Sequence, residues 1–323
     1  MKAGVGFEWR EMAYTEVGAE AANVLLSAAG CAELLDIDIL AGGWANSNYL
    51  LSLTDGSRLV LKVWNERSVE DVRMLNSCIE LIAQHGVPTP VPLIFEGGDS
   101  VMVVDGLAWM LLPFVDAPWL TGDLASMRHL GEIIARLHSI PDDGRFGEFY
   151  HMGTDIWPDL FERADTNGAW SPFLRLLEAE YARMAEAIPA GLPRGIIHGD
   201  LFQDNILADL GRVKAVLDFE DVCSNILAND LVVAFIGCGW DGDEPVEERW
   251  HALLGGYESV RVLSAEEHAA MPELYRYATL SVAAWRYRKF VMDLPGSEHA
   301  GRYKLMLDRL EIPLPFLSRE VEE

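Results

Sequence analysis

Cysteine is scarce in this sequence, and long hydrophobic runs are absent. The four cysteines are scattered without a Cys-x-x-Cys pair, at Cys31, Cys78, Cys223 and Cys238. This spacing is typical of reduced thiols in a cytosolic protein. No apolar stretch reaches the roughly 18 residues that a membrane helix needs, and residues 1–6 lack the basic-then-apolar order of a signal peptide. We therefore expect a cytoplasmic protein that does not act in a membrane.

Positive charge is also scarce. The chain has 25 Lys and Arg residues against 51 Asp and Glu residues, which leaves a formal net charge of −26. Nucleic acids and anionic membranes are polyanions, so a protein of this charge repels them, and we expect neither as a partner. The same acidity suits a cationic small-molecule substrate, although acidic surfaces also serve simply to keep proteins soluble.

The chain has two parts of different character. Its 323 residues, 50% of them hydrophobic, can bury a sizeable core, and two lobes of ordinary size are the natural expectation. The first part should hold helices over 12–30 and 68–85 and short strands over 36–40, 49–53, 59–64, 100–104 and 107–112. Beyond a linker the pattern is mostly helical, over 127–137, 151–190, 230–240 and 273–294. We therefore expect an N-terminal lobe, 1–112, and a C-terminal lobe, 113–323.

The most informative stretch lies at residues 196–220. A short apolar run enters a His-Gly-Asp loop that ends at Asp200, and Asn205 stands five positions later. Two short strands, 205–208 and 214–217, are joined by a glycine-containing turn and place Asp218 at the end of the second strand. Two carboxylates and one amide thus converge, and such oxygen ligands suit a hard divalent cation such as Mg²⁺ beside phosphates. The alternative interpretation is an acidic loop next to a hairpin.

This stretch resembles the catalytic region of protein kinases, which have the same order of Asp, Asn and Asp. Here His-Gly-Asp replaces His-Arg-Asp, and Asp-Phe-Glu replaces Asp-Phe-Gly. Both departures resemble the aminoglycoside phosphotransferase and choline kinase superfamily, and the stretch is most similar to its type II homoserine kinase branch. The resemblance covers nearly the whole chain from about residue 36. It implies an α+β, protein-kinase-like fold with a small antiparallel-sheet lobe, which has one main helix, and a larger, mostly helical lobe.

The resemblance also implies an ATP- and Mg²⁺-dependent kinase that phosphorylates a hydroxyl group of a small molecule. Asp200 is then the candidate base for the attacking hydroxyl, and Asn205 and Asp218 are candidate Mg²⁺ ligands. We expect His198 to fix the loop through hydrogen bonds and not to act as a base. Lys62 matches the lysine that contacts the α- and β-phosphates, although a lone strand lysine is usually a solvated side chain.

Further nucleotide contacts are expected in the first lobe. The polar loop 42–48 lacks Gly-x-Gly-x-x-Gly, and the chain has no Gly-x₄-Gly-Lys-[Ser/Thr] motif. Its Gly-Gly-x-x-Asn-Ser-Asn-Tyr sequence nevertheless resembles type II homoserine kinases, and three residues could donate to phosphate, namely Asn46, Ser47 and Asn48. The segment 111–114 is either a plain linker or the hinge that holds adenine, with Val60 and Leu112 as apolar contacts.

In this superfamily a glutamate on the following helix pairs with the lysine. Its usual place falls near Ser77, which cannot form an ion pair. Glu70, two turns earlier on the same face, and Glu80 are the substitutes, and we favour Glu70. Ser68 and Asp71 resemble a capping box at the start of this helix.

The acceptor is expected to be a small amine-bearing alcohol, with L-homoserine as the leading candidate. Acidic side chains close to the metal-binding aspartate suit the amine, namely Glu220, Asp221 and Asp230. Asp230 lies in Asn-Asp-Leu, which resembles the Tyr-Asp-Leu of relatives, but it could equally cap a helix. The carboxylate of homoserine requires a guanidinium, which Arg286 and Arg288 offer unless they form a solvated helix face.

Other functions are compatible with these residues. Choline, ethanolamine, aminoglycoside and sugar kinases belong to the same superfamily. A metal-dependent phosphatase could use His198, Asp200, Asn205 and Asp218 as ligands, but it leaves Lys62 unexplained. A catalytically inactive, nucleotide-binding regulatory protein is disfavoured because the catalytic positions are intact. Neither a preference for ATP over GTP nor the oligomeric state follows from the sequence.

Overall fold

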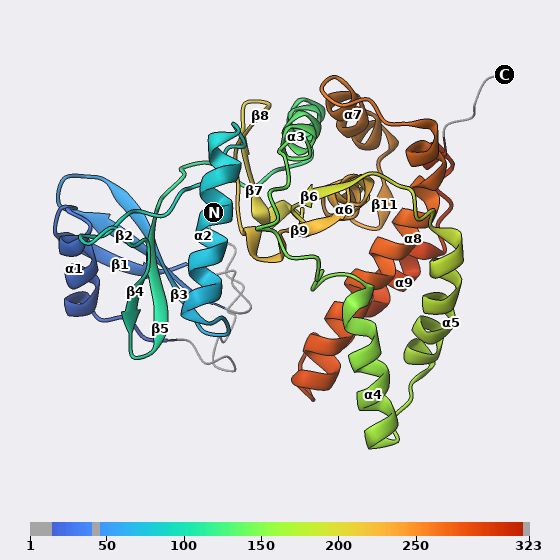
Figure 1. Ribbon diagram of the computed structural model, residues 1–323, viewed down its shortest axis with the longest axis horizontal. Helices are drawn as coiled ribbons and strands as arrows, with labels where there is room; N and C mark the ends of the chain where they lie inside the picture. Colours follow the sequence, from blue (N-terminus) through green and yellow to red (C-terminus); the bar gives the residue numbers. More distant parts are fainter. Residues whose placement is uncertain (1–14, 41–45, 319–323) are drawn as a thin grey trace. The chain divides into compact units, whose positions relative to one another are not determined.

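The computed structural model describes residues 15–40 and 46–318, and the chain divides into two compact units (Figure 1). The first unit comprises Met1–Ala83 and Thr89–Asp116, and the second comprises Gln84–Pro88 and Ala117–Glu323. The expected boundary between residues 112 and 113 falls at the end of the last strand of the first unit, shortly before this division.

The first unit is built on a five-stranded antiparallel sheet with the strand order β1-β2-β3-β5-β4. Asp105 and Gly106 join β4 to β5, and both have positive φ (50° and 81°), as a two-residue type I′ turn requires. The strands are β1 Leu34–Ile39, β2 Ser47–Leu53, β3 Arg58–Trp64, β4 Met102–Val104 and β5 Leu107–Pro113. Each of the predicted strands of this part is therefore present, within two residues at either end.

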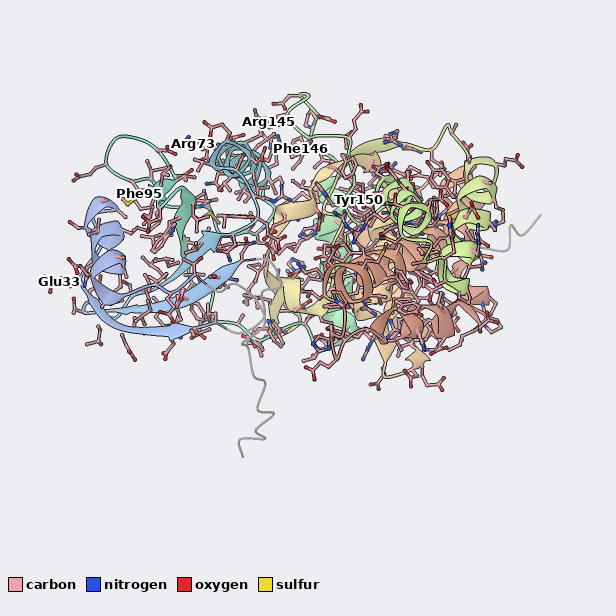
Figure 2. The ribbon with its side chains drawn as sticks, turned by 90° about the horizontal axis from the view of Figure 1, so that it is seen from below. Glu33, Arg73, Phe95, Arg145, Phe146 and Tyr150 are labelled. Carbon is pink, nitrogen blue, oxygen red and sulfur yellow. The ribbon has the colours of Figure 1, made fainter. Side chains whose placement is uncertain are left out.

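The core of the first unit lies between the sheet and α1, Ala19–Ala28. Alternation along β3 turns one set of side chains toward that core, namely Leu59, Leu61 and Val63. They share the core with Leu25 and Leu26 of α1 and with Phe95, which is labelled in Figure 2. The other face of β3 carries Val60, Lys62 and Trp64. The strand thus separates a hydrophobic core on one side from a face that bears Lys62.

The two helices of the first unit differ in how closely their bounds match those predicted from the sequence. Residues 12–14 of the helix expected over 12–30 lie outside the described residues. In the described part the helix begins at Ala19, because the backbone of Thr15 bonds to the side chains of Ser47 and Tyr49 instead of to a helical turn. Helix α2, Val69–Gln84, follows the prediction closely. The Ser68 hydroxyl accepts a hydrogen bond from the Asp71 N–H at 3.1 Å, as expected of the cap.

The second unit is mostly helical and, in its described part, contains three two-stranded sheets. Its helices are α3 Leu124–Leu137, α4 Trp157–Asn167, α5 Pro172–Ala187, α6 Ala228–Cys238, α7 Glu247–Glu258, α8 Ala265–Tyr287 and α9 Arg302–Leu310. The strand pairs are β6 Arg194–Ile197 with β9 Cys223–Ile226, β7 Ile206–Asp209 with β8 Arg212–Val216, and β10 Trp240–Asp241 with β11 Glu244–Pro245. None of the described helices is long and apolar enough to cross a membrane.

Two helices of the second unit depart from the sequence-based expectation. Helix α7 was not predicted, because Gly255 and Gly256 interrupt its pattern. A Cβ atom on Gly256 would lie 1.8 Å from the Arg128 carbonyl oxygen, so glycine is what allows α7 to pack closely against α3. Helix α8 begins at Ala265 and not near 273, because Ser264 and Glu267 form a capping box and Pro272 is accommodated within the helix.

An ion-pair cluster joins α5 to α8. The carboxylate of Glu180, which is 7% exposed, accepts hydrogen bonds from Arg183 at 2.8 Å and from Arg276 at 2.6 and 2.9 Å. Arg183 also donates to Glu273 at 2.7 Å. The hydrogen bonds from Arg276, and then from Arg183, lower the pKa of Glu180 to about 2. The ionised carboxylate is therefore favoured in the folded protein.

We expect Glu180→Gln to lower the free energy of unfolding at pH 7 by about 1–3 kcal/mol, because two arginines lose their shared anion. The pKa of Glu180 is depressed in the folded state, so its contribution is present above pH 4.5 and is lost as the pH falls toward about 2. Urea unfolding of both proteins at several pH values measures this. The difference should shrink below pH 4.5, and the exposed control Glu186→Gln should show none; a difference that stays constant would contradict the assignment.

Candidate active site

The His-Gly-Asp loop follows β6, and its glycine is required by the space around it. Gly199 has φ +83°, and a Cβ atom there would lie 2.7 Å from the ring of Tyr150 and 3.0 Å from the Asp221 carbonyl oxygen. The Tyr150 hydroxyl donates a hydrogen bond to the Gly199 carbonyl oxygen at 2.5 Å. An arginine at this position, as in protein kinases, would therefore be strained and would collide with Tyr150.

The carboxylate of Asp230 fixes the backbone of this loop through hydrogen bonds. It lies in the first turn of α6 and is fully buried. Its Oδ2 accepts a hydrogen bond from the His198 N–H at 2.7 Å, and its Oδ1 accepts one from the Gly199 N–H at 2.9 Å. The expected place of Asp230 at the acceptor side was wrong, because both carboxylate oxygens are bound to the loop backbone and are shielded from solvent.

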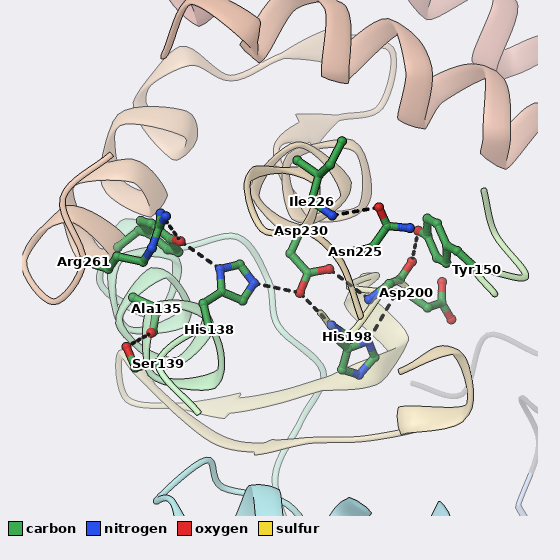
Figure 3. A network of polar contacts seen from close by, with 12 residues as sticks. Ala135, His138, Ser139, Tyr150, His198, Asp200, Asn225, Ile226, Asp230 and Arg261 are labelled. Atoms are coloured by element: carbon green, nitrogen blue, oxygen red, sulfur yellow. Dashed lines mark hydrogen bonds and ion pairs between the residues drawn. The ribbon is translucent and has the colours of Figure 1, made fainter. Parts of the chain in front are cut away.

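A chain of buried polar groups supports Asp230 (Figure 3). Arg261 donates to the Tyr257 hydroxyl oxygen at 2.9 Å, so that hydroxyl is free to donate to Nδ1 of His138, which lies at 2.8 Å. Nε2 of His138 then carries the hydrogen that points at Asp230 Oδ2, 3.2 Å away. The carboxylate therefore has three donors, which is what a buried anion requires.

His198 connects the loop to the strand that leads to Asp218. Its Nδ1 accepts from the Asp200 N–H at 3.1 Å, so Nε2 carries the hydrogen and donates to the Leu217 carbonyl oxygen at 2.9 Å. Burial lowers the pKa of this imidazole. The Leu217 N–H donates to the Asn205 carbonyl oxygen at 2.8 Å. Because both ring nitrogens are engaged, His198 fixes the loop, and this expectation is confirmed.

Asp218 follows β8 in an unusual backbone conformation. Its φ of 62° and ψ of 57° lie in the left-handed region, which costs a non-glycine residue about 1 kcal/mol. The preceding residue is held on both sides, by His198 and by Asn205. The following Phe219 is buried, with its ring centroid 4.5 Å from that of His198. Strain supported in this way is typical of functional positions.

Asn205 is bound directly to Asp200. Its Nδ2 donates to Asp200 Oδ2 at 2.8 Å and to the Asp200 carbonyl oxygen at 2.9 Å. Among the described residues, its Oδ1 has no hydrogen-bond partner. Burial first, and then the charges of Asp221, Asp218 and Asp204, raise the pKa of Asp200 well above its usual range, whereas the Asn205 hydrogen bond opposes this shift. Carboxylates crowded in this way favour a bound cation.

The donor set suits a cation held by few protein ligands. Within residues 15–40 and 46–318, no three His, Cys, Asp or Glu side chains form a metal-binding cluster. Mg²⁺ usually takes one or two carboxylates together with water and phosphate oxygens. The carboxylate of Asp218 and the unbonded Oδ1 of Asn205 are consistent with that type of site.

The other residues expected near the acceptor differ in their surroundings. Glu220 and Asp221 lie in the 3-10 turn Phe219–Asp221, directly after Asp218. The Arg288 Nε atom lies 3.8 Å from Oδ2 of Asp293, whose Oδ1 binds Arg163 at 2.8 Å, so Arg288 has an acidic neighbour that it shares with Arg163. Arg286 donates to the Arg302 carbonyl oxygen at 3.2 Å. The two arginines therefore do not act as one pair.

Within the first unit, Lys62 and the adenine candidates share one face of the sheet. Lys62 is 7% exposed, and its Nζ lies 4.2 Å from the ring centroid of Trp64. It stands between Asn48 of β2 and Met110 of β5. Val60 and Leu112 are cross-strand partners, and both are half-buried. This face thus presents a lysine beside an apolar pair.

Two expected nucleotide contacts have other roles. Ser47 is fully buried, and its hydroxyl accepts hydrogen bonds from Thr15 at 2.9 Å and from Asn65 at 3.1 Å, so it supports β2 and does not face a nucleotide. The Oδ1 atom of the buried Asn46 accepts from the Asn65 N–H at 3.4 Å, while residues 41–45 of the expected loop lie outside the described residues.

Glu70 also lies elsewhere than expected. Its side chain is 80% exposed and pairs with Arg73 at 3.3 Å, so the prediction that it pairs with Lys62 was wrong. The buried polar side chain of α2 is Asn76, which donates to the Ser100 hydroxyl at 2.9 Å. The spacing along the helix had placed the lysine partner near Ser77, one residue from Asn76. Asn76 is uncharged, so nothing in the sequence distinguished it.

Comparison with known proteins is consistent with this geometry. A family model described as the phosphotransferase enzyme family matches residues 36–263. A homoserine kinase of Phenylobacterium zucineum is 30% identical over 274 residues, which cover 83% of this chain and 84% of the relative. A homoserine kinase of Nitrobacter winogradskyi is 30% identical over 285 residues, 86% of each chain.

Solved structures share the fold. A choline/ethanolamine kinase family protein from Mesorhizobium loti gives a TM-score of 0.66 at 18% identity, over 91% of this chain and 95% of that one. A spectinomycin phosphotransferase in complex with ADP and spectinomycin gives 0.65 at 14% identity, over 94% and 96%. The expected α+β, protein-kinase-like fold is confirmed. The chain therefore belongs to the phosphotransferase enzyme family and is a small-molecule kinase.

Proposed function

We propose that this kinase transfers the γ-phosphoryl group of ATP to the hydroxyl oxygen of L-homoserine in a Mg²⁺-dependent reaction. The observation that carries the proposal is the joint placement of Asp200, Asn205 and Asp218 by one hydrogen-bonded loop. The choice of acceptor is supported by the two homoserine kinases, each 30% identical and matched over more than four fifths of this chain.

Asp200 would align the acceptor and take its proton. Asn205 occupies its Oδ2, so Oδ1 is the carboxylate oxygen that can meet the acceptor hydroxyl. In the transfer the hydroxyl oxygen forms a bond to the γ-phosphorus, and the bond to the β–γ bridging oxygen breaks. ADP leaves, and the hydroxyl proton passes to Asp200. Catalysis of this kind depends chiefly on positioning, which the rigid hydrogen-bonded loop supplies.

The remaining residues would bind the reactants. Lys62 would contact a nucleotide phosphate, and the half-buried Val60 and Leu112 would contact adenine. Mg²⁺ held by Asp218 and by Oδ1 of Asn205 would supply positive charge to the nucleotide phosphates. The charge of Asp221, which follows Asp218 in the same turn, would attract the amine of the acceptor.

The acceptor is tested by a coupled ADP-release assay across amino acids, amino alcohols and aminoglycosides. We expect a higher kcat/KM for L-homoserine than for choline, ethanolamine or an aminoglycoside. If another alcohol is phosphorylated and L-homoserine is not, the acceptor assignment fails.

The role of Asp200 is tested by the kcat of Asp200→Asn. This variant should lower kcat by about 10²–10⁴-fold, because an amide cannot take the proton. Turnover of Asp200→Asn within about threefold of wild type removes Asp200 from the mechanism.

The cation ligands are tested by titrating ATP into two variants with and without Mg²⁺. Asp218→Ala should abolish the Mg²⁺-dependent part of ATP binding, because the carboxylate neutralises the cation. Asn205→Ala should weaken it less, because an amide contributes only a dipole. Equal affinities of wild type and both variants in the presence of Mg²⁺ would contradict this assignment.

A further inference from the structure

Arg286 has no acidic partner within residues 15–40 and 46–318, although the protein as a whole is strongly acidic. It lies near the end of α8 and is only partly exposed. Among the described residues its guanidinium makes one hydrogen bond, to the Arg302 carbonyl oxygen, and no carboxylate lies within ion-pair distance. Several arginines of this unit have acidic partners, for example Arg163 with Asp293 and Arg183 with Glu273, whereas others, such as Arg249, donate within the described residues only to backbone carbonyl oxygens. Arg286 belongs to the second group, and its single hydrogen bond to that part of the chain leaves most of its N–H donors available to a ligand.

The surroundings of Arg286 are positively charged. Arg302 is the first residue of α9, and Arg309 lies near the end of the same helix. Arg309 is committed to the fold, because it donates to the Ile236 carbonyl oxygen at 2.9 Å and lies 4.3 Å from the ring centroid of Trp240. Burial first, and then the charges of Arg302 and Arg309, lower the pKa of Arg286 to about 10. Such a site stabilises an anion that enters it.

This positive site adjoins the catalytic loop. Ile236, which binds Arg309, precedes Gly237, and a Cβ atom on Gly237 would lie 2.5 Å from the Leu201 carbonyl oxygen. Leu201 directly follows Asp200 in the chain. The charges of Asp200 and Asp204 also act on Arg286. All these groups belong to the second unit, so their mutual placement is that of one compact body.

We propose that Arg286, with Arg302 beside it, binds the carboxylate of the acceptor and so selects amino acids over amino alcohols. The inference rests on the proposed function, because it concerns the acceptor of the same reaction. A guanidinium matches the two oxygens of a carboxylate with paired N–H donors, which suits one anionic end of a small zwitterion. We leave Arg288 out of this site, because it faces the carboxylate of Asp293, which Arg286 does not.

Paired acceptors that differ only in the carboxylate test this. L-Homoserine is compared with 3-aminopropan-1-ol, and L-serine with ethanolamine, in wild type and in Arg286→Gln. We expect Arg286→Gln to lower kcat/KM for L-homoserine by about 30–300-fold, as for loss of a buried charged hydrogen-bond partner. The value for 3-aminopropan-1-ol should change less than about threefold. Arg302→Gln should reduce the same preference to a smaller degree, and the exposed Arg175→Gln serves as the control.

Four results would overturn the inference. An equal loss for both members of a pair would show that Arg286 acts on Asp200 or on the transferred phosphate. An unchanged preference for the carboxylate in Arg286→Gln, with a loss in Arg288→Gln, would place the contact at the other arginine. A wild-type enzyme that prefers the decarboxylated member of both pairs would contradict it while leaving the kinase activity intact. If no member is phosphorylated, the proposed function itself fails and removes this inference with it.

Discussion

The His-Gly-Asp loop of this kinase depends on one buried carboxylate. Asp230 binds the backbone N–H groups of His198 and Gly199, and His138 provides a third donor. Breaking such a buried arrangement by removing one partner typically costs about 3–5 kcal/mol. These bonds fix the loop backbone just before Asp200 and so set the orientation of that residue. The imidazole of His198 extends the same control to the residue before Asp218. One anion thus positions the two carboxylates, Asp200 and Asp218, to which we assign the base and a cation ligand.

The charges around the loop are divided by sign. Asp204, Asp218 and Asp221 crowd Asp200 and raise its pKa, whereas Arg286 lacks a carboxylate partner among the described residues. A bound cation and an amine would reduce the repulsion among the aspartates, and a bound carboxylate would compensate the charge of Arg286. A hydroxylated amino acid supplied with Mg²⁺–ATP carries all of these charges. The overall net charge of −26 alone would have indicated only a cationic ligand.

Local structure could be predicted from the sequence, whereas contacts between distant residues could not. Asp200, Asn205 and Asp218 could be grouped because they lie in one short segment with strand and turn signals. The contact of His138 with Asp230 joins residues 92 positions apart, and no local pattern marks such a pair. Glu70 was chosen from helix spacing, but an exposed first-turn carboxylate finds Arg73 nearby. The missed α7 contains two glycines whose packing role appears only in three dimensions.

The role of Asp230 is tested most directly by the turnover number of Asp230→Asn. An amide offers one acceptor oxygen where two backbone N–H groups need one each, so we expect kcat to fall at least about 100-fold, with ATP affinity within about threefold of wild type. Circular dichroism establishes that the variant is folded, and Tyr150→Phe, which removes one bond to Gly199 without charge, should show a smaller loss of the same kind. A folded Asp230→Asn protein with wild-type kcat would contradict the account.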